Sequence, residues 1–124
     1  MTALPEDRRY SPDDAWARRE GPLVRVGVTP SLAAALRGVR AVSLPVVGAR
    51  VQAGAPLCTI EDDKATLDVY APCDGRVSGV NAALVADPGL LRRDPLEAGW
   101  LCLLEAAGDF VLLEAAAYAR RRAH

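Results

Sequence analysis

The chain has 124 residues, of which 51% are hydrophobic and 25% are charged, and its formal net charge is −1. This length fits one domain, and the composition is typical of a folded globular protein rather than a disordered chain. No apolar run approaches the ~20 residues that a membrane-spanning helix needs. Balanced charge and few aromatic residues also disfavour a nucleic-acid surface. We therefore expect neither a membrane nor a nucleic acid as a partner.

Residues 1–20 are polar and charged, and they are expected to form a segment that covers the edge of the core, with Tyr10 and Trp16 as anchors. Residues 1–10 contain charges and a proline but no apolar stretch, so no secretory signal is expected there. The three cysteines show no paired spacing, which indicates a reducing, cytoplasmic location.

Cysteine and histidine are too sparse to suggest a metal site. Cys58 and Cys102 lie within apolar runs and are expected to pack as small hydrophobic side chains. Cys73 lies beside a turn, where more access is expected, although a structural role is favoured. The one histidine, His124, is the last residue, so no metal ligands are expected.

Residues 21–105 have the pattern of a mainly β protein with short helices. Thr29 and Pro30 are typical of a helix start, and the helix is expected over residues 31–37 and to end at Gly38. One or two short helical turns are expected within residues 81–93. A last helix is expected from Phe110 to about Arg122, capped by Asp109. Strands are expected at residues 23–28, 39–44, 57–60, 67–70, 77–80 and 100–105, which together predict a compact antiparallel sandwich or barrel.

Lys64 is the only lysine of the chain, since the other 14 basic residues are arginine. It lies in the segment Glu61-Asp62-Asp63-Lys64-Ala65, between two apolar strand segments. This pattern predicts a hairpin with Asp62 and Asp63 in the turn and Lys64 at or beside its tip. An exposed amine on a long stem suits the covalent attachment of a carrier group, whereas a solvated charge balanced by its neighbours is the alternative.

Elsewhere the sequence has no recognisable catalytic set. It contains no nucleophile elbow, no glycine-rich phosphate loop and no metal-spaced cluster of histidine, cysteine and carboxylate side chains. No other set of residues therefore competes with Lys64 as a candidate for chemistry.

Several spaced segments of the chain resemble the H-protein family of the glycine cleavage system, which carries lipoate. The segments are Tyr10-Ser11 with Trp16, residues 26–29, 42–48, 61–65 and 68–72, Val80-Asn81 and residues 99–101. This resemblance implies a barrel-sandwich hybrid fold with a C-terminal helix. It implies one lipoyl-carrier domain over residues 1–124, with its β core at 21–105, its lipoyl hairpin near 57–70 and its last helix at 109–122.

The resemblance also implies roles for the residues of the hairpin. Lys64 corresponds to the site of covalent lipoyl attachment, and Glu61 to the acidic residue that lipoyl-attaching enzymes recognise. Asp62, Asp63 and Ala65 complete the hairpin that is recognised. The lipoyl arm then carries a reaction intermediate between separate enzymes. The resemblance thus implies that the protein is not itself an enzyme and that its contribution is tethering.

Four departures from the family pattern leave the partner enzymes open, and one of them is Leu36-Arg37-Gly38-Val39 where the helix exit of the family usually reads Leu-Gly-Asp. Asp14-Ala15 precede Trp16 where the family usually has His-Glu, and Asp62-Asp63 replace a serine and an apolar residue. The net charge is also close to zero, whereas family members tend to be acidic. Because charge complementarity governs partner selection, these differences indicate an altered partner set.

Three functions follow from the resemblance. The first is a monomeric glycine-cleavage carrier that moves an aminomethyl group from the decarboxylase to the aminomethyltransferase. Its other partners are a lipoate ligase or lipoyl transferase and a reductase similar to dihydrolipoamide dehydrogenase. The second is an H-like lipoate-binding protein that carries sulfur intermediates for heterodisulfide-reductase-like enzymes of bacterial sulfur oxidation. The third is a non-catalytic lipoate relay or interaction module.

Overall fold

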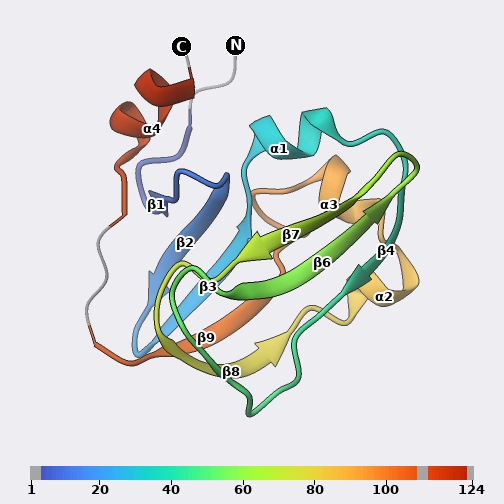
Figure 1. Cartoon of the computed structure of the whole chain (residues 1–124). Coiled ribbons are helices and arrows are strands. Elements are labelled where there is room, and N and C mark those ends of the chain that lie inside the picture. Colours follow the sequence, from blue (N-terminus) through green and yellow to red (C-terminus); the bar gives the residue numbers. More distant parts are fainter. Residues whose placement is uncertain (1–3, 109–111, 123–124) are drawn as a thin grey trace.

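The computed structural model of the chain describes residues 4–108 and 112–122 (Figure 1). Asp109, Phe110 and His124, which the sequence predictions include, lie outside these residues. The helices are α1 (Pro30–Ala35), α2 (Ala83–Ala86), α3 (Leu90–Arg93) and α4 (Ala115–Arg122). The strands are β1 (Arg9–Tyr10), β2 (Ala15–Glu20), β3 (Leu23–Val28), β4 (Val39–Ser43), β5 (Arg50–Val51), β6 (Pro56–Asp62), β7 (Thr66–Tyr70), β8 (Gly75–Val80) and β9 (Cys102–Ala106).

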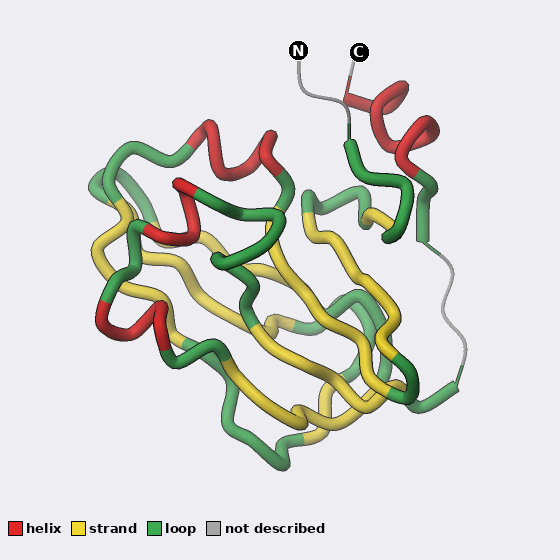
Figure 2. The backbone as a smooth tube through the Cα atoms, turned by 180° about the vertical axis from the view of Figure 1, so that it is seen from behind, coloured by secondary structure: helices red, strands yellow, loops and turns green. Residues whose placement is uncertain are grey.

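The strands form two antiparallel sheets. The larger sheet has the order β1-β2-β3-β9-β8-β5, and the smaller sheet has the order β4-β6-β7. Figure 2 shows the two layers from behind, with the short helices at their margins. Within the described residues the two sheets do not close into one barrel. The predicted mainly β fold with short helices and a C-terminal helix is thus confirmed, in the form of an open two-sheet arrangement.

One hydrophobic cluster fills the space between the sheets. Val26 of β3 and Leu104 of β9 contribute from the larger sheet, and Ile60 and Val69 contribute from the smaller one. All four side chains are at most 2% exposed. Burial of apolar surface on this scale is the main favourable term in folding. The hairpin formed by β6 and β7 is therefore fixed to the core along its stem.

All three cysteines are free and buried. The packing predicted for Cys58 and Cys102 is confirmed, whereas the greater access expected for Cys73 is wrong, because its side chain is 2% exposed. A hydrogen bond to Cys58 and burial raise the pKa of the Cys102 thiol, and burial raises the pKa of the Cys73 thiol. Raised pKa values favour the neutral thiol, which is a poor nucleophile.

The start of α1 follows the sequence prediction. Thr29 Oγ1 accepts a hydrogen bond from the backbone N–H of Leu32 at 3.3 Å, and Pro30 occupies the first helical position. The helix ends at Ala35 instead of residue 37, because Leu36 adopts an extended conformation and buries its side chain in the core. Residues 36–38 therefore form a short connection that leads directly into β4.

The two ends of the described chain differ from the predictions. The segment expected to cover the core edge contains β2, which pairs with β3 from Ala15 to Glu20. The last helix begins at Ala115, because Leu113 instead pairs with Tyr10 through backbone hydrogen bonds of 2.7 and 2.8 Å. The region of α4 consequently lies beside β1 (Figure 1).

None of the helices in residues 4–108 and 112–122 combines the length and the apolar character needed to cross a membrane.

Candidate functional site: the hairpin that presents Lys64

Lys64 lies at the tip of the hairpin formed by β6 and β7. Glu61 pairs with Thr66, and the N–H of Asp62 donates to the carbonyl oxygen of Ala65 at 2.9 Å. These pairings leave Asp63 and Lys64 as the two residues at the turn. Asp62 is the last residue of β6, so the prediction that it belongs to the turn is wrong by one position. Figure 1 shows this turn at one end of the smaller sheet.

The Lys64 side chain is exposed. Among the described residues, no hydrogen bond or ion pair restrains its ammonium group. Glu61 and Ala65 on either side are exposed as well. The stem below is fixed, since Ile60 and Val69 are buried in the core. The hairpin thus presents a free amine on a rigid support.

The carboxylate of Asp62 binds another part of the chain. It accepts hydrogen bonds from the backbone N–H of Gly38 at 2.8 Å and from that of Arg37 at 3.1 Å. Hydrogen bonds from these N–H groups, Arg37 foremost, hold the pKa of the Asp62 carboxyl below its ordinary value. Asp62 therefore connects the end of β6 to the segment between α1 and β4.

The carboxylate of Asp63 is directed to the same segment. The Nε of Arg40 lies 2.8 Å from its Oδ1 atom, and both side chains are about half exposed or more. A Cβ atom added to Gly38 would lie 2.4 Å from Asp63 Oδ2, which shows how closely the two residues approach. The absence of a side chain at position 38 therefore permits this arrangement.

The five residues predicted for the hairpin thus fall into two groups. Lys64, Glu61 and Ala65 are exposed, whereas Asp62 and Asp63 contact residues 37–40. Sequence reasoning missed the contribution of Arg37 and Arg40. It identified Gly38 only as the end of a helix, and the sequence carries no local signal that pairs these residues with a hairpin more than 20 positions away.

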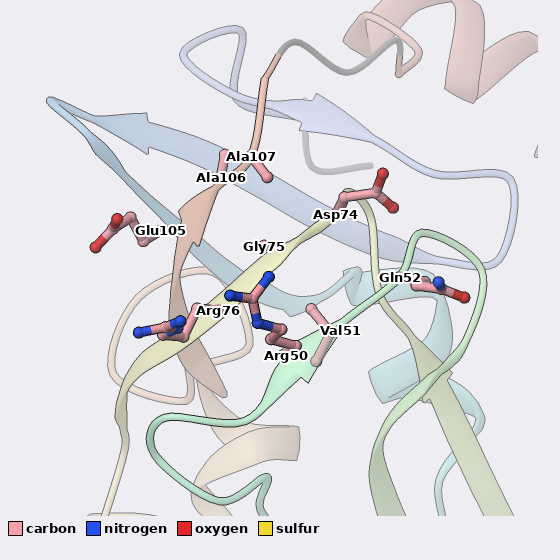
Figure 3. Close-up of a pocket in the computed structure, with 9 residues that line it drawn as sticks. All are labelled: Arg50, Val51, Gln52, Asp74, Gly75, Arg76, Glu105, Ala106 and Ala107. Atoms are coloured by element: carbon pink, nitrogen blue, oxygen red, sulfur yellow. The ribbon is translucent and has the colours of Figure 1, made fainter.

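A hollow of about 470 Å³ lies between β5, β8 and β9 (Figure 3). It contains none of the residues predicted for the site. Arg50 and Arg76 are direct partners across β5 and β8, and Asp74 and Glu105 also line the hollow, so the formal charges of its lining sum to zero. The hollow is therefore separate from the hairpin turn, and its lining offers no nucleophile.

The comparisons with known proteins agree on one family. The profile of the family described as Glycine cleavage H-protein matches residues 8–120. The glycine cleavage system H protein of Corynebacterium jeikeium is 42% identical over 122 residues, which cover 95% of this chain and 96% of the relative. That of Rubrobacter xylanophilus is 40% identical over 121 residues, which cover 98% of this chain and 96% of the relative.

A solved structure has the same fold. The crystal structure of a glycine cleavage system H protein from Mycobacterium marinum superimposes with a TM-score of 0.90 at 35% identity, and the match covers 98% of this chain and 100% of that one. All these relatives are named as glycine cleavage proteins, which favours the glycine-cleavage function over the sulfur-carrier alternative. Glycine cleavage H proteins carry lipoate covalently attached to a lysine. The chain therefore belongs to the glycine cleavage H-protein family and is a lipoyl-carrying shuttle.

Proposed function

We propose that Lys64 is the residue that carries the lipoyl group. The observation that supports this assignment most strongly is that Lys64 is the only lysine of the chain and lies exposed at a hairpin tip. An amide bond between a carboxylic acid and a side chain requires a primary amine, and arginine does not provide one. The residues at the tip fit the cofactor, because the amine is free and its support is fixed.

The role of the chain in this proposal is to hold and present the arm. Once bound, the lipoyl group supplies a disulfide-containing ring that takes up and releases a reaction intermediate. The buried stem residues Ile60 and Val69 keep the base of the arm in place. Tethering raises the local concentration of the reactive group at each partner enzyme. The chain itself catalyses no reaction and acts as one domain over residues 1–124.

Glu61 and Ala65 are proposed to contact the lipoyl-attaching enzyme. Glu61 lies three residues before Lys64, and its carboxylate is exposed and so accessible to a basic surface. Ala65 follows Lys64 with a small side chain, which leaves room for an enzyme to approach the amine. The attaching enzyme is a lipoate ligase or a lipoyl transferase.

The further partners proposed are the decarboxylating and aminomethyl-transferring enzymes of glycine cleavage and a reductase similar to dihydrolipoamide dehydrogenase. Family membership supports these partners, as does the full-length similarity to H proteins. We propose that the chain works with them in the cytoplasm as a monomer.

Reconstitution tests this function. The lipoylated chain is mixed with purified glycine-cleavage enzymes, and glycine-dependent turnover is measured against the Lys64→Arg variant. Turnover with the lipoylated wild type only is expected. If a fully lipoylated chain supports no turnover, the glycine role is wrong, and the sulfur-carrier function becomes the next to test.

A further inference from the structure

We infer that Asp62 is a positioning residue, whose carboxylate fixes the hairpin tip against residues 37–38 and so presents Lys64 to the enzyme that attaches lipoate. This inference rests on the proposed function, in which Lys64 is the attachment site. It assigns Asp62 and Asp63 to the internal support of the hairpin, and it leaves Glu61 as the acidic side chain available to the attaching enzyme.

The need for such support follows from where the core ends. Ile60 is the last fully buried residue of β6, and the residues from Glu61 to Thr66 are exposed apart from the half-buried Asp62. The hydrogen bond from Asp62 N–H to the Ala65 carbonyl closes the turn, but both of its partners belong to the hairpin, so it does not connect the turn to another segment. On one side, β4 pairs with β6 as far as Asp62, which lies opposite Val39, and this pairing ends before the turn. Side-chain contacts of the tip with residues 37–40 therefore add to the order of the turn.

Asp62 supplies that contact. Its carboxylate accepts hydrogen bonds from the backbone N–H groups of Arg37 and Gly38, which lie 25 and 24 positions away in the sequence. Hydrogen bonds from backbone N–H groups to a charged acceptor are stronger than those between neutral groups. They also satisfy donors that follow the last turn of α1, so both segments gain order from the same contact.

Asp63 adds a weaker contact at the same place. Both side chains of its ion pair with Arg40 are exposed to solvent, and exposed ion pairs contribute little to stability. Its carboxylate nevertheless lies against Gly38, and among the described residues it forms an ion pair with Arg40 and not with Lys64. Both aspartates are thus engaged with residues 37–40, and the lysine is not paired with either of them.

Loss of the Asp62 carboxylate is expected to loosen the tip without unfolding the protein. An attaching enzyme then has to order the backbone around Lys64 when it binds, which weakens binding. Once the hairpin is bound, the amine is in the same position as in the wild type. The Michaelis constant for the carrier is therefore expected to rise, while kcat changes little.

The test compares Asp62→Ala with Asp68→Ala. Asp68 is an exposed acid on the same hairpin, and it contacts Thr59 across the strands rather than residues 37–38. The control thus removes the same charge and keeps the contact with residues 37–38. Hydrogen exchange reports on the amides of Arg37 and Gly38, and mass spectrometry follows lipoate attachment by a purified lipoate ligase.

In Asp62→Ala, both amides are expected to exchange roughly three- to tenfold faster, and the Michaelis constant to rise by a similar factor. In Asp68→Ala, both quantities stay within twofold of the wild type. Asp62→Asn is expected to lie between, because its amide oxygen still accepts the bond from Gly38. All variants are compared well below their melting temperatures, so that global unfolding contributes neither to the exchange rates nor to the Michaelis constants.

Unchanged exchange or an unchanged Michaelis constant in Asp62→Ala overturns the inference, as does an equal effect in Asp68→Ala. A fall in kcat alone also contradicts it, since that would place Asp62 in the attachment chemistry. If the wild type takes up no lipoate, the proposed function fails instead, and the exchange rates still report whether Asp62 supports the tip.

Discussion

The hydroxyl group of Tyr118 hydrogen-bonds the hydroxyl group of Thr29 at 3.0 Å, which joins the last helix to the first turn of α1. Thr29 also caps that helix, and Tyr118 additionally bonds the carboxylate of Asp14. Thr29 and Tyr118 are at most 2% exposed, and the Tyr118 ring stacks on Tyr10 with 5.2 Å between centroids. The C-terminal helix is therefore an integral part of the packed structure.

Replacement of Tyr118 by phenylalanine is expected to lower the free energy of unfolding by about 1–2 kcal/mol, because it removes the hydrogen bonds that the buried Tyr118 hydroxyl makes with Thr29 and Asp14. Tyr70→Phe is the matched control, since Tyr70 is 37% exposed and lies in β7. Urea unfolding measures both variants. An equal loss in the two variants would mean that the Tyr118 hydroxyl does not connect the helix to α1.

Gly27 lies against the indole ring of Trp16, its partner across β2 and β3. A Cβ atom at position 27 would lie 2.4 Å from Cε2 and Cζ2 of that ring, and Trp16 is fully buried. Gly27→Ala is therefore expected to cost about 1–3 kcal/mol through overpacking.

Gly79→Ala is the control for this substitution, because the nearest atom to its added Cβ, in Leu103, is 3.7 Å away. Thermal unfolding followed by tryptophan fluorescence measures both variants. A Gly27→Ala protein with the melting temperature of the Gly79→Ala control would show that Trp16 is not packed against the β3 backbone.

Glu20 is expected to make stability depend on pH in acid. Its carboxylate bonds Arg25 at 2.7 and 3.0 Å and Arg18 at 2.9 Å, and these bonds, Arg25 foremost, lower its pKa from 4.5 to about 2. The folded state thus binds this proton more weakly than the unfolded state. The contribution of the ionised Glu20 carboxylate to the free energy of unfolding is complete above about pH 5 and is lost as the pH falls towards 2.

Melting temperatures of the wild type and Glu20→Gln between pH 7 and 2 test this dependence. The difference between the two proteins is expected to be largest near neutral pH and to shrink in acid. Curves that remain parallel over the whole range would show that Glu20 keeps an ordinary pKa in the folded protein.

Most strands of the β core can be predicted from the local sequence pattern, but β2 cannot. Residues 23–28 alternate as a strand does, and Thr29-Pro30 is a strong helix start, so both predictions are confirmed. In β2, by contrast, Ala15, Trp16 and Ala17 are buried in succession. The alanines face the main core and Trp16 faces the cluster with Tyr10 and Tyr118. Burial on both faces removes the alternation that identifies a strand.

The hairpin at Lys64 is also predictable from sequence, but the role of its aspartates is not. Turn residues between two apolar segments indicate where the chain reverses. The partners of Asp62 are backbone N–H groups of Arg37 and Gly38, and no side-chain pattern marks such donors. Only the packing of α1 and β4 beside the hairpin brings them within reach, so this contact depends on the tertiary fold.

The intact mass of the protein tests the central assignment most directly. The chain is produced with lipoate and a lipoate ligase, and its mass is compared with that of Lys64→Arg treated in the same way. The wild type is expected to gain one lipoyl group, on the peptide that contains Lys64, and the variant to gain none while it keeps the wild-type melting temperature. An unmodified wild type, or a variant that still gains the group, would contradict the assignment of Lys64 as the lipoyl site.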